Sequence, residues 1–297
     1  LISKILKQEI KMLNLKKKLF LGEELSEKEK SFNFSKFHIL PIPLEKTVSY
    51  GTGTSKAPEI IINASNQLER NHNSPCDFGI YTHDAFDCSL NSDSIFENIE
   101  NLIFDILKKD KIPVCIGGEH SLTFGVIKGF KKKFNNINEE FGIIQFDAHA
   151  DLRKTYNGSV NSHATVMYKI HKENIPIFQF GVRAQSDEEI KLRDEFNINY
   201  KSIEDYRKNP NIKLPKNFPK NIYITFDSDC LDPSIMPATG TPVPNGLYYN
   251  ETFLILEKLI EDKKIIGIDY VEYAPIENFH AYDYVSANII YDLMKLC

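Results

Sequence analysis

The chain is 297 residues long and carries 36 Lys and Arg against 41 Asp and Glu, a formal net charge of −5. That length suits one α/β domain with a large core, and the mixed charge without a basic stripe excludes nucleic acid as a partner. No apolar run reaches the ~18 residues that span a bilayer, and five scattered cysteines without a Cys-x-x-Cys pair predict reduced thiols and a cytoplasmic location.

Residues 1–36 are predicted to form an N-terminal extension. Apolar side chains in residues 1–20 have helical spacing but are interrupted by Lys and Glu, which excludes a secretion signal and favours a solvated terminal helix. An organelle presequence is the weaker alternative, because this stretch lacks Arg and contains Glu9. The chain begins with Leu1 rather than Met, and Met12 offers a conceivable natural start.

From residue 37 to residue 297, short apolar runs alternate with amphipathic segments. Strands are predicted at 37–43, 78–82, 112–118, 141–146, 175–182, 221–227 and 265–272. Helical patterns include 94–110, 121–134, 187–196 and 250–262. This alternation implies right-handed βαβ crossovers, so we expect a single-domain, three-layer α/β/α fold with a mainly parallel sheet.

Ionisable side chains gather just beyond the ends of the predicted strands, where open parallel sheets bind ligands. Residues two apart on an extended chain point to the same side, so "DAHAD" after 141–146 and "DSD" after 221–226 each aim two side chains at one point. "GGEHS" follows 112–116, and Glu272 ends the last strand. The resulting cluster has four carboxylates and two imidazoles: His120, Asp147, His149, Asp151, Asp227 and Asp229.

Such a cluster predicts bound metal ions, because buried carboxylates without cations cost several kcal/mol each. Oxygen-rich ligation with two imidazoles suits Mn²⁺, and six ligands exceed what one ion with an open position needs, so we expect two Mn²⁺ per chain. The alternative, unrelated caps and turns at four strand ends, is weaker for the whole set. It is preferred for Asp232 as a cap, for Gly117 and Gly118 as a tight turn, and for Cys230 as core packing.

Five motifs give the chain a specific resemblance to the arginase/agmatinase (ureohydrolase) family. They are "GGEHS" (117–121), "DAHADLR" (147–153), "SHAT" (162–165), "FDSDCLDPSIMPATGTPVPNG" (226–246) and "GIDYVEYAP" (267–275). The resemblance covers about residue 37 to the C-terminus. It implies a parallel α/β domain, a binuclear manganese centre held by the six residues above, a homo-oligomer (trimer or hexamer), and hydrolysis of small guanidino compounds to urea and an amine.

The resemblance also implies roles for individual residues. Asp151 would orient the attacking hydroxide and relay its proton, and His163 would shuttle protons near the substrate. Glu272 would pair with the guanidinium. Without the resemblance, His163 is equally well explained as a loop histidine that satisfies backbone groups. Asp269, in the middle of a strand, is expected to give structural support.

The substrate is predicted from the loops around this site. Arginases of the family hold the substrate carboxylate with an Asn where this chain has Arg153, and with a Ser-rich loop that differs here. "YGTGTSKAPE" (50–59) and "PATGTPVPNG" (237–246) look more like agmatinases, which implies cleavage of agmatine to urea and putrescine. If Arg153 and Lys154 faced the site, they would favour a carboxylate such as guanidinobutyrate. The open alternatives are an arginase, a guanidinobutyrase, a formiminoglutamase, a catalytically silent metal-binding homologue and an unrelated two-metal phosphoesterase.

Overall fold

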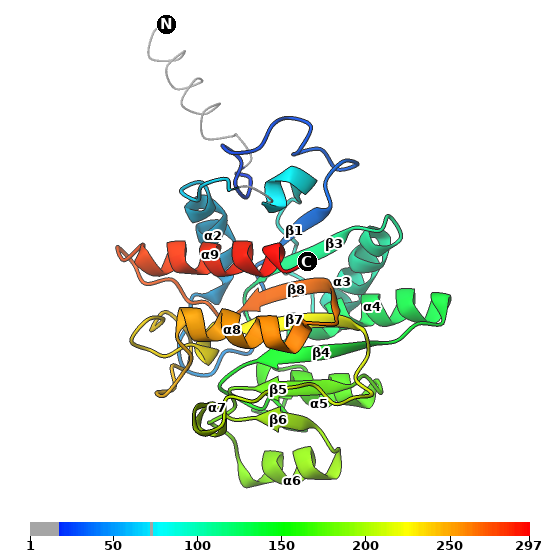
Figure 1. Cartoon of the computed structure of the whole chain (residues 1–297), viewed down its shortest axis with the longest axis vertical. Helices are drawn as coiled ribbons and strands as arrows, with labels where there is room; N and C mark the ends of the chain where they lie inside the picture. Colours follow the sequence, from blue (N-terminus) through cyan, green and yellow to red (C-terminus); the bar gives the residue numbers. More distant parts are fainter. Residues whose placement is uncertain (1–17, 72–73) are drawn as a thin grey trace, which may run out of the picture.

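The computed structural model describes residues 18–71 and 74–297, and its centre is a parallel sheet (Figure 1). Eight strands of the described chain follow the order β2-β1-β3-β8-β7-β4-β5-β6, and every neighbouring pair is parallel. They are β1 (Phe37–Ile42), β2 (Ile80–Thr82), β3 (Ile112–Gly117), β4 (Phe141–Phe146), β5 (Ile177–Phe180), β6 (Asn199–Lys201), β7 (Asn221–Asp227) and β8 (Lys264–Val271). The predicted single-domain parallel α/β class is confirmed.

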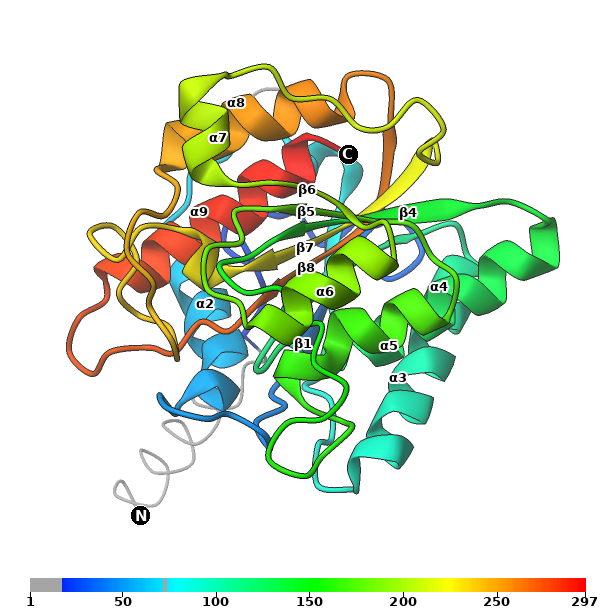
Figure 2. The ribbon, with the colours of Figure 1, turned by 90° about the horizontal axis from the view of Figure 1, so that it is seen from below.

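Helices cover both faces of this sheet (Figure 2). One hydrophobic core packs against α3 (Ser92–Leu107), α4 (Leu122–Ile137) and α5 (Val166–Lys172). The other packs against α2 (Ala57–Ser65), α7 (Ile203–Lys208), α8 (Tyr249–Ile260) and α9 (Ala281–Lys295), and α6 (Asp187–Glu195) follows β5. Coverage on both faces explains why all six residues of β4 are buried and why the strands read as continuous apolar runs.

Two edges of the sheet differ from the prediction. Residues 75–78 form a short 3₁₀ helix, so β2 starts only at Ile80. The structure also contains β6, which sequence patterning did not indicate because this three-residue edge strand exposes Asn199 and Tyr200. Since β6 has one neighbour, β5, it needs no apolar run on both faces.

The part of the N-terminal extension that the structure describes packs on the domain. Phe20 and Leu21 are fully buried. The backbone N–H of Phe20 donates to Thr82 Oγ1 at 3.0 Å, and that of Leu21 donates to Ser65 Oγ at 2.9 Å. The helix expected at the start of the chain falls mostly in residues 1–17, outside the described residues. The boundary between residues 36 and 37 stays a prediction.

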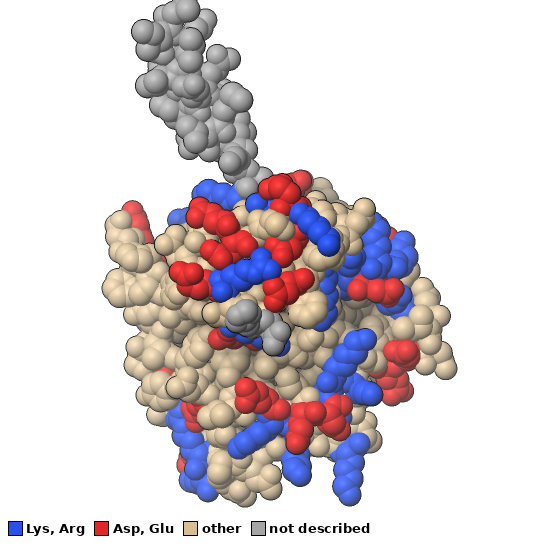
Figure 3. Space-filling view, turned by 45° about the horizontal axis from the view of Figure 1, so that its top comes forward, with Lys and Arg blue, Asp and Glu red and all other residues tan. Residues whose placement is uncertain are grey.

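The surface and the thiols agree with the composition. Lys and Arg are interspersed with Asp and Glu on the face that Figure 3 displays. All five cysteines are free. Within the described ranges, no helix combines the length and the apolar character needed to cross a membrane. The predicted cluster of Asp and His, in contrast, is largely buried and lies at the carboxyl ends of the central strands.

Candidate metal centre

His120 joins three of the predicted carboxylates at the ends of β3, β4 and β7. Its Nδ1 lies 3.2 Å from Asp147 Oδ2, 3.0 Å from Asp151 Oδ2 and 3.5 Å from Asp227 Oδ2. The strands bring these residues together because they end at the same edge of the parallel sheet, with β8 between β3 and β7. His120, Asp147 and Asp151 form one group that could hold a metal ion.

The second group forms around His149 and shares Asp147 with the first. His149 Nδ1 lies 2.9 Å from Asp229 Oδ2 and 3.6 Å from Asp147 Oδ1. Backbone amides fix these carboxylates: the N–H of Ala148 donates to Asp229 Oδ1 at 3.0 Å, and that of Asp229 donates to Asp227 Oδ1 at 2.8 Å. Two adjoining groups with one shared carboxylate provide ligands for two neighbouring cations.

The pKa values show an excess of negative charge in this cluster. Burial raises the pKa of Asp227 well above its usual value, and the charges of Asp229 and Asp147 raise it further. Burial and the neighbouring Asp147 raise the pKa of Asp151 to about 7. Burial alone would lower the pKa of His149, but Asp229 and Asp147 raise it to about 12. The site therefore favours added positive charge, which divalent cations would supply.

The hydrogen bonds of His120 match a metal ligand. Its Nε2 lies 2.8 Å from Thr225 Oγ1, which donates its proton to Asp269 Oδ1 at 2.6 Å. Since the Thr225 proton is committed to Asp269, Nε2 must be the donor to Thr225. Nδ1 is buried among carboxylate oxygens without a hydrogen-bond partner in acceptable geometry. This orphaned atom and its oxygen-rich neighbours fit a divalent cation, with a carboxylate that orients the imidazole from behind.

Two buried glutamines hold the turn after β4, and the sequence analysis did not identify them. Gln145 Nε2 donates to Asp147 Oδ2 at 2.7 Å, and Gln179 Nε2 donates to Gln145 Oε1 at 2.6 Å and to the Ala150 carbonyl at 2.8 Å. Gln145 had a readable signal, because it interrupts an apolar strand two residues before Asp147 and so shares its face.

Arg183 performs a similar task for the loop that carries Asp229. Its guanidinium donates to the carbonyl oxygens of Asp229 at 2.7 Å, Val243 at 2.7 Å and Pro244 at 3.0 Å. An arginine just after the strand 175–182 has no distinctive local pattern, since its acceptors lie 46 to 61 residues further along the chain.

Glu272 faces the same site from the end of β8. Its Oε1 accepts a hydrogen bond from the backbone N–H of His120 at 2.6 Å, and its carbonyl accepts one from Thr239 Oγ1 at 2.9 Å. Burial raises the pKa of Glu272 to about 8, against the effect of the His120 N–H. Glu272 and Asp151 both have positive φ, at 60° and 53°, and such backbone strain in non-glycine residues concentrates at functional sites.

A cleft lies over the cluster. Residues 48–51, His163, Gly240 and Thr241 line it together with five of the cluster's acids and histidines: His149, Asp151, Asp227, Asp229 and Glu272. Among the described residues that line it, none is Lys or Arg. Burial lowers the pKa of His163, which favours the neutral imidazole.

The cations beside the motif "DAHADLR" are not among the residues that line the cleft. Arg153 Nε lies 3.8 Å from Glu189 Oε2, and the Arg153 guanidinium carbon lies 5.4 Å from the centre of the Tyr156 ring. Lys154 is exposed. The structure therefore removes the reason to expect a carboxylate-bearing substrate.

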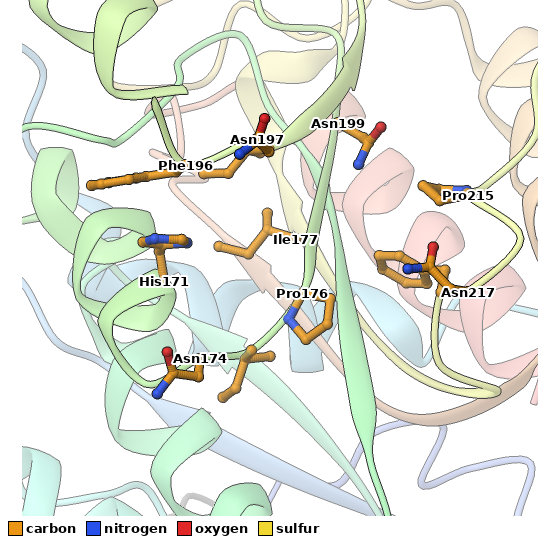
Figure 4. Close-up of a pocket in the computed structure, with 12 residues that line it drawn as sticks. His171, Asn174, Pro176, Ile177, Phe196, Asn197, Asn199, Pro215 and Asn217 are labelled. Atoms are coloured by element: carbon orange, nitrogen blue, oxygen red, sulfur yellow. The ribbon is translucent and has the colours of Figure 1, made fainter. Parts of the chain in front are cut away.

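A cavity of about 310 Å³ lies elsewhere on the molecule, beside the start of β5 (Figure 4). His171 stacks on Phe196 there with ring centres 3.9 Å apart, and the other lining residues are asparagines, prolines and apolar side chains. No Asp or Glu of the described chain lines this cavity, so it offers neither a cluster of metal ligands nor a partner for a guanidinium.

Comparison with known proteins places this site in a family. The family model described as "Arginase family" matches residues 35–295. The chain belongs to the arginase family. The N(1)-aminopropylagmatine ureohydrolase of Synechocystis is 33% identical, with 86% of this chain and 87% of the relative covered. The agmatinase of Pyrococcus horikoshii is 32% identical, with 79% and 82% covered.

Solved structures agree with the fold of this arginase-family chain. A putative agmatinase from Clostridium difficile has a TM-score of 0.75 and 30% identity, with 90% of this chain and 97% of that chain covered. The agmatine ureohydrolase of Thermoplasma volcanium has a TM-score of 0.80 at 24% identity, with 96% of both chains covered, and shows the shared fold. The predicted family and hydrolase class are confirmed, and the chain is a ureohydrolase of the arginase family.

Proposed function

We propose that this ureohydrolase cleaves agmatine to urea and putrescine with two Mn²⁺ ions. The observation that carries this proposal is the buried carboxylate of Glu272, which lines one cleft with the Asp and His cluster while no Lys or Arg lines it. A guanidinium is a planar cation that a carboxylate binds through charge-assisted hydrogen bonds. The proposed ligands of the ions are His120, Asp147, His149, Asp151, Asp227 and Asp229.

The chain's own residues would supply binding and proton transfer. When bound, the two ions supply a water of lowered pKa as the nucleophile. Glu272 would hold the guanidinium, Asp151 would take a proton from the attacking water, and His163 would deliver one to the leaving nitrogen. The guanidinium and one water become urea and a protonated amine, so atoms and charge balance.

The far end of the substrate separates agmatine from arginine. Arginine would bring a carboxylate into the cleft, and specific binding of it needs well-placed donors. Arg153 lies instead beside Glu189 and Tyr156. Agmatine has an ammonium at this end, and it needs only space and water or an acceptor. The absence of Lys and Arg from the described lining residues therefore supports agmatine.

A second candidate substrate is N¹-aminopropylagmatine. Relatives from Synechocystis and Thermus thermophilus, 33% and 30% identical, are named for its hydrolysis. This compound keeps the guanidinium and the four-carbon chain of agmatine and continues beyond the far nitrogen. Tyr50 lines the cleft and is 84% exposed, so the cleft opens to solvent beside Tyr50 and has an exit for such an extension.

The test is urea release from agmatine, N¹-aminopropylagmatine, arginine and guanidinobutyrate by the manganese-loaded protein. We expect kcat/KM for agmatine to exceed that for arginine by about tenfold or more, equivalent to ~1.4 kcal/mol of transition-state binding. Equal or faster hydrolysis of arginine would overturn the agmatine proposal. A preference for the aminopropyl compound would select the second candidate. A preference for guanidinobutyrate would overturn the agmatine proposal, because no Lys or Arg of the described chain lines the cleft to bind its carboxylate.

Metal content and assembly are tested on the same preparation. Elemental analysis should give about two manganese ions per chain. A fully active protein with one tightly held zinc would contradict this part of the proposal. The proposal also includes a trimer or hexamer in the cytoplasm, and light scattering coupled to size-exclusion chromatography measures the mass of the assembly.

A further inference from the structure

Glu119 is a buried carboxylate that belongs to neither the ligand set nor the proposed guanidinium contact. It is 1% exposed and accepts four hydrogen bonds. The backbone N–H groups of Lys46 and Thr47 both donate to Oε2 at 2.5 Å. The hydroxyls of Thr47 and Ser121 donate to Oε1 at 2.9 and 2.5 Å. All four contacts come from donors, so both carboxylate oxygens of Glu119 act as acceptors.

The hydroxyl of Thr47 connects Glu119 to His163. Thr47 Oγ1 accepts from the backbone N–H of His163 at 3.1 Å and lies 3.3 Å from His163 Nδ1. This hydroxyl has one proton, and Glu119 takes it. Thr47 Oγ1 can therefore only accept from the imidazole, so Nδ1 must carry a proton and Nε2 keeps its lone pair.

We propose that Glu119 is a positioning residue that acts through Thr47 to hold His163 in the tautomer with the proton on Nδ1. The competing donor is Ser162, whose Oγ lies 3.4 Å from Nδ1 and accepts from the backbone N–H of Ala164 at 3.4 Å. If the Ser162 hydroxyl donated to Nδ1, the opposite tautomer would form. Thr47 is the nearer group and is oriented by a carboxylate, so it prevails.

This tautomer matters for the proton transfer in the proposed function, on which the kinetic part of this inference rests. With Nδ1–H held on Thr47, Nε2 is the ring nitrogen that takes a proton and then releases it to the nitrogen of the departing amine. The ring keeps its Nδ1 proton and its orientation throughout. Glu119 also anchors residues 46 and 47, just before the part of the loop that lines the cleft.

The tautomer can be measured in the metal-free protein, independently of any substrate. The ¹⁵N chemical shifts of the imidazole rings are recorded at pH 7.5 on histidine-labelled protein, with His163→Asn to assign the signal. We expect Nδ1–H in the wild type and in Thr47→Ser, which keeps the hydroxyl. Thr47→Val should lose this preference. Nε2–H in the wild type, or unchanged signals in Thr47→Val, would overturn the proposal.

Glu119→Gln offers a second variant in which Thr47 is intact. Both partners of Oε2 are backbone N–H donors, so the new amide NH₂ group must take the place of Oε1. It then donates to Thr47, which frees the Thr47 proton for His163 Nδ1. We expect this variant to switch His163 to the Nε2–H tautomer. Retention of Nδ1–H in a folded Glu119→Gln protein would contradict the role of Glu119.

Kinetics separate positioning from general structural support. Thr47→Val should lower kcat for agmatine about tenfold, with KM and manganese content unchanged. This is less than the ~10²–10⁴-fold range of general acid–base effects, because His163 itself is retained. Thr47→Ser should recover most of that loss. In a His163→Asn background, Thr47→Val should have no further effect on kcat. Equal losses of kcat in both backgrounds would mean that Thr47 has only a structural role. If the wild type shows the expected tautomer but releases no urea from agmatine, only the proposed substrate is overturned.

Discussion

Two sets of buried carboxylates lie near one another in this molecule, and they are stabilised differently. Asp269 is fully buried in β8 and accepts hydrogen bonds from Thr123 Oγ1 at 2.8 Å, Tyr223 OH at 2.8 Å and Thr225 Oγ1 at 2.6 Å. Asp147 is just as buried, but its neighbours include other carboxylates and two imidazoles. Burial alone therefore does not indicate that an acid is a metal ligand. The groups around it, hydroxyl donors or other carboxylates and imidazoles, make the difference.

The difference shows in the causes of the pKa shifts. Burial raises the pKa of Asp269, and hydroxyl donors and His120 act against that rise. Burial also raises the pKa of Asp227, but there Asp229 and Asp147 add to the rise. Hydroxyls can satisfy one buried carboxylate, whereas four carboxylates at one point need cations. The two sets meet at Thr225, which donates to Asp269 and accepts from the proposed metal ligand His120.

The largest expected effect tests whether bound cations stabilise the cluster of carboxylates. Asp229→Ala should lose bound manganese and lower kcat by about three orders of magnitude, roughly 4 kcal/mol. It also removes one of the repelling carboxylates, so in chelator the variant should unfold at the same temperature as the wild type or higher. Elemental analysis, urea release and thermal melts in EDTA measure these effects. A variant that keeps two ions per chain and loses only rate would show that Asp229 is not a ligand.

A smaller effect is expected where the two sets meet. In Asp269→Asn, the amide NH₂ group would replace Oδ1, and Thr225 would then have its proton free to donate to His120 Nε2. That change places the other His120 proton on Nδ1, the proposed ligand atom. We expect manganese affinity to fall about 10–100-fold, with activity recovered by excess Mn²⁺.

Tyr223→Phe is the matched control for this prediction. It removes one donor to Asp269 Oδ2 and leaves the contacts between Asp269, Thr225 and His120 in place. Its unfolding free energy should fall by about 1–3 kcal/mol, because a buried carboxylate oxygen loses one of its two donors and keeps only Thr123 Oγ1. Manganese affinity should stay at the wild-type value. Equal affinity losses in both variants would mean that Asp269 acts only through general stability.

Sequence patterning predicted the cluster of Asp and His that the structure brings together, but not the groups behind it. Asp147, His149, Asp227 and Asp229 were readable because alternate positions at the end of an apolar strand point the same way. Thr225 and Thr47 were not, since a single hydroxyl in a strand or loop has many ordinary uses. Their partners lie far away in the chain: the residue numbers of His120 and Thr225 differ by 105, and those of Thr47 and Glu119 differ by 72. Such pairs exist only once the fold has formed.

His38 shows a third way to bury an ionisable group, which is to keep it neutral. It is fully buried; its Nδ1 lies 2.9 Å from His83 Nε2, and its Nε2 donates to the Phe32 carbonyl at 3.2 Å. Burial, with a further contribution from His83, lowers the pKa of His38 to about 3. The folded protein therefore binds fewer protons here than the unfolded chain, whose histidines titrate near pH 6.5.

The smallest predicted effect follows from this difference in proton binding between the folded and the unfolded chain. Stability contributed by neutral His38 is complete above about pH 6.5 and is lost as the pH falls from there toward 3, with a limiting slope of about 1.4 kcal/mol per pH unit. The measurement is urea unfolding of the wild type and of His38→Gln at pH 7, 6 and 5. The stabilisation from Glu29, whose pKa Arg70 lowers to about 2, changes only below about pH 4.5, where it is lost as the pH falls. It therefore lies outside this window. The wild type should lose about 1 kcal/mol more than the variant between pH 6 and pH 5, because only the wild type must take up the extra proton on unfolding. Equal slopes would mean that His38 is protonated in the folded state. Burial in the neutral form would then no longer be a third way, besides those of Asp269 and of the cluster of Asp and His, in which this protein buries an ionisable side chain.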